Sequence, residues 1–389
     1  MELTPDDERS LRGEHGEAIA SAYRILVAIG AATEAKRLVP IKWAHLSGVN
    51  YNTIGNVGVK FLEKFAEDGA TRAAVKTTVN PMGFDRTKPS NLDENFVKQQ
   101  MKIVKLYEEL GTTPSFTCAP YEIFDIPQTG TPVSFAESSA AIYSNSILGL
   151  LTNKESSLSA LASSITGKAP YSELRVEEFR HPKIAIKPEL KLLTELDYGL
   201  FGYFIGKVVK DSCVAIDGIR KSKSDIMKTK SLSAAIGTSG TCGMFTSSEE
   251  ESTKEVIPFD KTQLNAVRDE LHTAEDGSVI VLGSPQIGIN EISLVVDLAK
   301  DKKFSKRCMI FCSRAIFNQA TQIGLAGKIE GAGGEFMCDS CACLTPLINR
   351  DDVDSIVTNS IKAAYYMKHF NRTGVALKDL KTIVKDYTN

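Results

Sequence analysis

The segment RCMIFCSRAIFNQATQIGLAGKIEGAGGEFMCDSCACL, residues 307–344, places a helix pattern between two strand patterns. RCMIFC and GGEFMCDSCACL are apolar runs that predict strands, and the spacing of apolar residues in 313–325 predicts a helix. The same alternation recurs along the chain, which predicts an α/β protein with largely parallel sheets. Further strands are expected in LVPIKWAHL, RAAVKTTV and SVIVLG, and further helices at 4–30, 94–110, 136–149 and 291–300.

The chain has 389 residues, which is long for a single core and predicts two or three packed lobes. Its net charge of -2 gives no electrostatic reason to expect nucleic acid as a partner. No apolar run reaches the roughly 18 to 20 residues that span a bilayer, and the charged start MELTPDDERS is unlike a secretory signal. We therefore expect a cytoplasmic protein that binds neither nucleic acid nor a membrane.

Six of the eight cysteines fall into three short stretches, FTCAPY, RCMIFC and CDSCAC. In a reducing compartment such groups more often bind metal or carry out redox chemistry than form disulfides. Three separated segments that converge could hold an iron–sulfur cluster through thiolates. A structural zinc site would need two paired ligand motifs, and the sequence has one C-x-x-C, Cys338 with Cys341. The alternative is that these cysteines are small buried hydrophobic residues.

Polar, glycine-bearing loops follow several predicted strands: SGVNYNTIG after LVPIKWAHL, NPMGFD after RAAVKTTV and SPQIGINE after SVIVLG. Because ligands bind beyond the carboxyl ends of parallel strands, these loops together predict one polar site, although each alone is typical of a turn. In FAESSAAIYSNSILGLLTN, Ser138 and Asn145 would share one face of a helix, as in a binding site. The alternative is that Ser138 and Ser139 cap this helix while Glu137 balances its dipole.

The order of several motifs along the chain resembles the aconitase X family. These motifs are AHLSGVNYNTIGNVGVKFLE, TTVNPMGFD, FTCAPY, AESSAAIYSNSILGLLTN, ITGKAPY, DYGLFGYFIG, the DSC of CDSCAC and TNSIKAAYY, and the resemblance runs from about residue 8 to 380. It implies an aconitase-like fold, with several α/β lobes around a central cluster-binding cleft. It also implies that residues 1–389 form a large catalytic subunit, and that a small swivelling subunit is a separate chain in a heterodimer or larger assembly.

The resemblance implies an iron–sulfur cluster that acts as a Lewis acid. The family's three ligand motifs correspond to Cys118, Ser284 and Cys341. The middle motif departs from the family pattern, because GSPQ at 283–286 has serine in place of cysteine and glutamine in place of histidine, and serine is much the weaker acid. The expected cluster is [4Fe-4S] or [3Fe-4S], with [2Fe-2S] as an alternative. Replacement ligands to consider are Cys242, Cys312 and Cys343, the last of which shares a face with Cys341 if the run is extended.

The same matching implies which residues contact the substrate. Lys362 is suited to pairing with a carboxylate or phosphate, and the alternative is a solvated surface lysine. The five histidines are scattered and none is a convincing general base, so no catalytic residue is assigned and the base is expected on the small subunit. The implied substrate-binding residues are Gly48, Val49, Asn50, Asn80, Pro81, Glu137, Ser138 and Lys362.

Three functions are consistent with the resemblance. The first is a hydro-lyase large subunit that dehydrates the phosphorylated hydroxy acid (R)-5-phosphomevalonate to trans-anhydromevalonate 5-phosphate in the archaeal mevalonate (isoprenoid) pathway. The second is cis-3-hydroxy-L-proline dehydratase, and the stand-alone length of this chain favours the first function over the fused enzymes of that kind. The third is a non-enzymatic iron–sulfur regulatory protein, suggested by the lost cysteine ligand. The retained Asn80, Glu137, Ser138 and Lys362 disfavour this third function.

Overall fold

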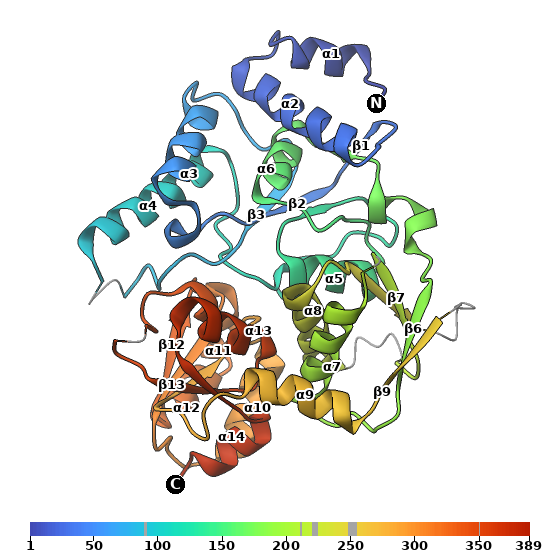
Figure 1. Ribbon diagram of the computed structural model, residues 1–389. Coiled ribbons are helices and arrows are strands. Elements are labelled where there is room, and N and C mark those ends of the chain that lie inside the picture. Colours follow the sequence, from blue (N-terminus) through green and yellow to red (C-terminus); the bar gives the residue numbers. More distant parts are fainter. Residues whose placement is uncertain (89–91, 211, 220–224, 248–254, 350) are drawn as a thin grey trace.

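The structure is a computed structural model that describes residues 1–88, 92–210, 212–219, 225–247, 255–349 and 351–389. In this part of the chain, helices surround four β-sheets, and the three larger sheets are parallel. Figure 1 shows the N-terminal part at the top, the middle part at the lower right and the C-terminal part at the lower left. Strands alternating with helices confirm the predicted α/β fold.

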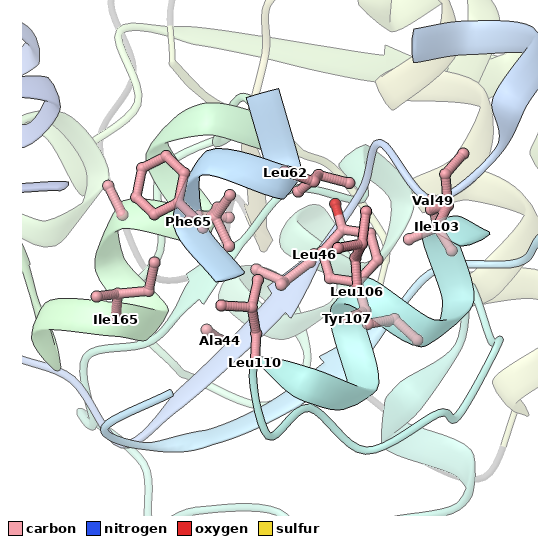
Figure 2. Packing of buried hydrophobic residues seen from close by; sticks show 14 of the residues in the cluster. Ala44, Leu46, Val49, Leu62, Phe65, Ile103, Leu106, Tyr107, Leu110 and Ile165 are labelled. Atoms are coloured by element: carbon pink, nitrogen blue, oxygen red, sulfur yellow. The ribbon is translucent and has the colours of Figure 1, made fainter. Parts of the chain in front are cut away.

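The N-terminal part contains a two-stranded antiparallel sheet and a three-stranded parallel sheet, whose central strand, residues 43–46, comes first along the sequence. Its elements are α1 (Pro5–Leu11), α2 (Glu17–Ala32), β1 (Leu38–Pro40), β2 (Trp43–Leu46), α3 (Tyr51–Ala66), β3 (Lys76–Val79), α4 (Glu94–Glu109), β4 (Ser134–Phe135), α5 (Ser138–Ser146), α6 (Ser157–Thr166) and β5 (Lys168–Pro170). Leu46 of β2, Phe65 of α3, Ile103 of α4 and Ile165 of α6 belong to one apolar core (Figure 2). This core fixes α3 and α4 against the strands whose ends form the site.

The middle part is a second parallel sheet with helices packed closely on it. Its elements are β6 (Ile184–Pro188), α7 (Glu195–Val208), β7 (Cys213–Ile216), α8 (Ile226–Ser239), β8 (Met244–Ser247), β9 (Glu255–Phe259) and α9 (Lys261–Leu271), with strand order β8-β7-β6-β9. Helices α7 and α8 approach so closely that a Cβ atom added at Gly202 would lie 2.6 Å from the backbone oxygen of Leu232.

The C-terminal part is a five-stranded parallel sheet with helices around it. Its elements are β10 (Val279–Leu282), α10 (Ile289–Ala299), β11 (Arg307–Cys312), α11 (Arg314–Gln322), α12 (Leu325–Gly331), β12 (Gly334–Cys338), β13 (Ser355–Thr358), α13 (Ile361–Tyr366), β14 (Gly374–Leu377) and α14 (Leu380–Asp386). The strand order is β12-β11-β10-β13-β14. All four residues of β10 are buried, as expected for a parallel strand covered on both faces.

Glycine residues divide one predicted helix and lie at the end of another. The sequence predicts one helix over 4–30, but Gly13 and Gly16, with φ of 90° and 103°, separate α1 from α2. The helix predicted over 313–325 is found as α11, which ends at Gln322, shortly before Gly324, with φ of 78°. Glycine adopts positive φ without steric cost, and this conformation interrupts an α-helix. No helix in the described ranges has the length and apolar character to cross a membrane.

Candidate active site

Loops that follow strands of two different parallel sheets meet at one place. Glu137 follows β4 of the N-terminal sheet, while Ser284 and Lys362 follow β10 and β13 of the C-terminal sheet. The two sets are joined by an ion pair between Lys362 and Glu137 and by a 2.9 Å hydrogen bond from Met82 N to the backbone oxygen of Asp339. In each sheet the strand order changes direction once along the sequence: β3 and β4 lie on opposite sides of β2, and β11 and β13 lie on opposite sides of β10. Parallel sheets bind ligands at the points where the strand order reverses in this way.

The loop 48–50, between β2 and α3, is held from both sides. Gln100 Nε2 of α4 donates to the backbone oxygen of Val49 at 2.7 Å. The Asn50 side chain caps α3, and its Nδ2 donates to the backbone oxygen of Leu344 at 3.1 Å. This loop of the N-terminal part is therefore tied to the turn that carries the last cysteines of the C-terminal part.

A chain of buried polar contacts runs from Lys362 into the N-terminal sheet. Lys362 donates to the Glu137 carboxylate, which also accepts from Asn80 Nδ2 at 2.9 Å. Asn80 Oδ1 lies 2.9 Å from His45 Nε2, and His45 Nδ1 lies 2.8 Å from the Thr78 hydroxyl. Because Asn80 Oδ1 is an acceptor, His45 Nε2 carries the proton and Nδ1 accepts from Thr78.

Burial and neighbouring charges determine the charge state of each titratable side chain in this series of polar contacts. Burial opposes ionisation of Glu137, but the charge of Lys362 and hydrogen bonds from Lys362, Asn80 and Ser139 outweigh it and lower the pKa of Glu137 to about 2. Burial opposes the charge of Lys362, yet Glu137 and neighbouring cysteines raise the pKa of Lys362 well above its ordinary value. Burial lowers the pKa of His45 to about 4. At neutral pH the site thus holds a carboxylate, an ammonium and a neutral imidazole.

Three buried cysteine side chains gather next to this polar chain. The side chains of Cys341 and Cys343 are close enough to interact with each other, and Cys343 Sγ lies 3.0 Å from Ser284 Oγ. Cys118 Sγ accepts a 3.1 Å hydrogen bond from Gln286 N. A negative charge on the Cys118 thiolate would interact with negative charges on the thiolates of Cys341 and Cys343. The structure therefore brings together all three positions that the sequence predicts as ligands, and adds Cys343.

The turn that carries Cys341 and Cys343 differs from the sequence prediction. The strand predicted over 333–344 ends at Cys338, and Ala342–Leu344 forms a 3-10 turn. The two cysteines thus meet through a tight turn and not through alternation along an extended strand.

The other two replacement candidates have different partners. Cys312 Sγ lies 4.0 Å from Cys338 Sγ, between the neighbouring strands β11 and β12. Cys242 Sγ donates to the backbone oxygen of Met244 at 3.2 Å in the middle part. Of the three candidates, it is Cys343 that the structure places against Ser284.

The donor set fits an iron–sulfur cluster. Cysteine thiolates are the usual ligands of such clusters. Hydrogen bonds to the ligand sulfur, like that from Gln286 N to Cys118, adjust the reduction potential of a cluster. In the described part of the chain, buried Ser340 Oγ and Gln286 Oε1 have no hydrogen-bond partner, as expected where a bound group completes the site. No three His, Cys, Asp or Glu side chains in the described ranges are grouped so as to hold a metal ion. A cluster has different requirements, because its thiolates bind different iron atoms.

A buried group of charges supports the loop that carries Ser284, and sequence reasoning missed it. Lys230 of α8 donates to Glu122 at 3.0 Å, to the backbone oxygen of Gln286 at 3.0 Å, and to Glu291. Burial opposes the charge of Lys230, but the two carboxylates outweigh it and raise its pKa. The feature of the sequence that could have indicated this group is Lys230 itself, a lysine among the small and apolar residues of α8.

A cavity of about 670 Å³ reaches the cysteine group from outside. Cys343 lines it together with Asn52 and Thr53 of α3, and Phe370 at its edge is 69% exposed. The cavity therefore extends from the surface to the residue Cys343, which is itself buried.

The predicted substrate-binding residues all lie on the loops that meet here or next to them. Glu137 is the N-cap of α5 and accepts from Ser139, so its capping role is present together with its ion pair. Ser138 lies against Gly237 of α8. Their contact with substrate stays a prediction. The buried members are Val49, Asn50, Pro81, Glu137 and Lys362, and the partly exposed ones are Gly48, Asn80 and Ser138.

Comparison with protein families finds three consecutive matches. The aconitase X first domain matches residues 1–178, the second domain 182–273 and the third domain 277–389. The solved structure titled Thermococcus kodakaraensis aconitase X (holo-form) is similar over 100% of both chains, with a TM-score of 0.91 and 32% sequence identity.

Curated relatives of two kinds are similar to the chain. It is 33% identical to the phosphomevalonate dehydratase large subunits of Methanocaldococcus jannaschii and Thermococcus kodakarensis, over 99% of this chain and 100% of each relative. It is 31% identical to the cis-3-hydroxy-L-proline dehydratase of Hypocrea jecorina, over 94% of this chain and 65% of that relative.

Proposed function

This chain belongs to the aconitase X family, and we propose that it is the large subunit of a hydro-lyase of the mevalonate pathway. The proposed reaction is dehydration of (R)-5-phosphomevalonate to trans-anhydromevalonate 5-phosphate, in which a hydroxyl leaves one carbon and a proton leaves the carbon next to the carboxylate. The observation that carries the proposal is the buried Lys362–Glu137 pair beside the three gathered cysteines, at the carboxyl ends of two parallel sheets.

The sequence identities of the relatives named above favour this substrate over the alternative. The chain spans phosphomevalonate dehydratase large subunits from end to end, but about two thirds of the cis-3-hydroxy-L-proline dehydratases.

The proposed cofactor is an iron–sulfur cluster bound through Cys118 and Cys341, of the [4Fe-4S], [3Fe-4S] or [2Fe-2S] type. When bound, it supplies a Lewis acid for the departing hydroxide. Lys362 keeps its proton and carries three N–H donors, one of which Glu137 accepts. We assign to Lys362 the binding of the substrate carboxylate or phosphate. Glu137 and Asn80 are assigned the positioning of the Lys362 ammonium.

No group in this polar chain is suited to take the proton from carbon. Glu137 is a weak base, since its pKa is about 2, and Lys362 stays protonated. The neutral His45 uses both ring nitrogens in hydrogen bonds within the protein. The base is therefore proposed to lie on the small subunit, and the large subunit alone should be nearly inactive.

The test is to mix the purified, iron-reconstituted large subunit with its small subunit and to follow loss of water from (R)-5-phosphomevalonate by NMR. Lys362→Ala should lower kcat/KM. The fall should correspond to a loss of transition-state stabilisation on the order of 2 to 5 kcal/mol. Lys362→Arg should retain more activity, because it keeps the charge. Lys381→Ala, at an exposed position of α14, is the matched control and should be unchanged.

Three results would contradict the proposal in different ways. Full activity of the isolated large subunit would show that the base lies on this chain. Preferred turnover of cis-3-hydroxy-L-proline would move the assignment to the second function. A cluster-containing complex with no turnover of either compound would favour the regulatory function.

A further inference from the structure

We propose that Cys343 replaces the missing thiolate at position 284, so that Cys118, Cys341 and Cys343 hold the cluster. This inference rests on the proposed function, because it assumes that a cluster is bound. It assigns Ser284 a different task, that of a hydroxyl neighbour which hydrogen-bonds to the sulfur of Cys343. The observation behind it is the 3.0 Å distance between Ser284 Oγ and Cys343 Sγ.

The first argument is one of position. A ligand atom on the side chain at position 284 would lie at or near the place of Ser284 Oγ, and the sulfur of Cys343 is in direct contact with that atom. The Cys343 side chain also interacts with that of Cys341, so a group bound by Cys341 is within reach of Cys343. A thiolate from position 343 therefore approaches the same corner of the site as the thiolate that position 284 lacks.

The second argument concerns ligand chemistry. Iron–sulfur clusters are held by cysteine thiolates, whereas an alcohol has to lose a far less acidic proton before it can ligate. With a thiol and a hydroxyl side by side, iron is expected to bind the thiolate. The hydroxyl of Ser284 can then donate a hydrogen bond to that sulfur, as backbone N–H of Gln286 does to Cys118.

The third argument is that the backbone holds Cys343 at this point. The 3-10 turn Ala342–Leu344 is fixed by two hydrogen bonds to the backbone oxygen of Leu344, from Asn50 Nδ2 at 3.1 Å and Asn52 Nδ2 at 3.2 Å. Cys343 Sγ also contacts the backbone oxygen of Lys362 at 3.9 Å. The cysteine is thus held between elements of both parts that form the site.

One consequence concerns access. Cys343 lines the 670 Å³ cavity together with Asn52 and Thr53. Cys343 is therefore a proposed ligand that borders a surface cavity.

The experiment compares five alanine variants of the large subunit, purified without oxygen and reconstituted with iron and sulfide. Iron and acid-labile sulfide per chain and the visible and EPR spectra are measured, none of which requires activity. Cys343→Ala, Cys118→Ala and Cys341→Ala should each lose most of the iron and sulfide, while Ser284→Ala should retain both with a shifted spectrum. Cys312→Ala, a buried cysteine paired with Cys338, is the matched control and should match wild type.

A sixth variant separates ligand loss from misfolding. In Cys343→Ala/Ser284→Cys the thiolate moves to position 284, and iron and sulfide should return to wild-type amounts. Circular dichroism of the cluster-free variants checks that each is folded.

The outcomes distinguish this inference from the proposed function. Retention of the full cluster in Cys343→Ala, together with its loss in Ser284→Ala, would overturn the inference and make serine the ligand, while the iron–sulfur hydro-lyase would stand. Failure of Cys343→Ala/Ser284→Cys to recover iron, in a folded protein, would also count against it. Wild-type protein that takes up no iron and sulfide would overturn both.

Discussion

Breaking the Lys362–Glu137 ion pair should destabilise the docking of the N-terminal part on the C-terminal part. The pair joins α13 to the start of α5, and both side chains are about nine-tenths buried. Lys362→Met leaves the Glu137 carboxylate with hydrogen bonds from Asn80 and Ser139 but without a counter-charge. Removing one partner of a buried pair costs more than removing both, because an uncompensated charge stays in a poorly solvated place.

The pKa of Glu137, which Lys362, Asn80 and Ser139 together lower against the effect of burial, sets the scale of the effect. Its ordinary value of 4.5 falls to about 2 in the folded protein, a difference of about 2.5 units. At about 1.4 kcal/mol per unit, this corresponds to roughly 3 kcal/mol of stability at neutral pH, in line with the roughly 3 to 5 kcal/mol typical of broken buried pairs. Because the folded pKa lies below the unfolded one, this contribution is complete above pH 4.5 and is lost as pH falls toward 2.

The assay is thermal unfolding of cluster-free protein at pH 7, followed by circular dichroism, for wild type, Lys362→Met, Glu137→Gln and the double variant. For a folding unit of 150 to 250 residues, about 3 kcal/mol lowers Tm by roughly 6 to 12 °C. Each single variant should show such a fall, and the double variant should lose less than their sum, because it buries no unpaired charge. Additive losses, or a fall in Lys362→Met of under about 2 °C, would refute the reasoning.

Three further predictions concern other buried features. The pKa of His45 falls from 6.5 to about 4 on folding, so the unfolded chain takes up the proton first; stability should fall by about 1.4 kcal/mol per pH unit from pH 6.5 to 4, and urea midpoints of His45→Gln should lack this slope. Gly202→Ala should lower Tm, at a cost of about 1 to 3 kcal/mol, because the added Cβ would lie 2.6 Å from the backbone oxygen of Leu232. Gly327→Ala has open space around it and should raise stability by about 0.5 to 1 kcal/mol. Equal changes in Tm for the two variants would contradict this. Lys230→Met should lower Tm by an amount equivalent to about 3 to 5 kcal/mol and increase hydrogen exchange at 284–288, because two buried carboxylates lose their cation; unchanged exchange there would contradict a supporting role.

Local sequence determines much of the fold. SVIVLG and RCMIFC are continuous apolar runs, and they form buried strands because helices cover both faces of a parallel sheet. Boundaries were predicted less closely, since the strand expected over 72–79 begins at Lys76 and the helix expected over 136–149 spans Ser138–Ser146. Apolar spacing reports which face of an element is buried, but an element's ends depend on caps and on glycine conformation.

Tertiary structure decides which of the motif residues act together. Lys362 and Glu137 are 225 residues apart, and Ser284 and Cys343 are 59 apart. Periodicity within one strand carries no information about which strand lies beside it, and here β10 pairs with β13 across two intervening strands of the sequence. That strand order brings the loops after β10 and β13 together and sets them against the loop after β4. The sequence alone therefore left three cysteines as equal replacements for the missing ligand, and the folded chain places Cys343 against Ser284.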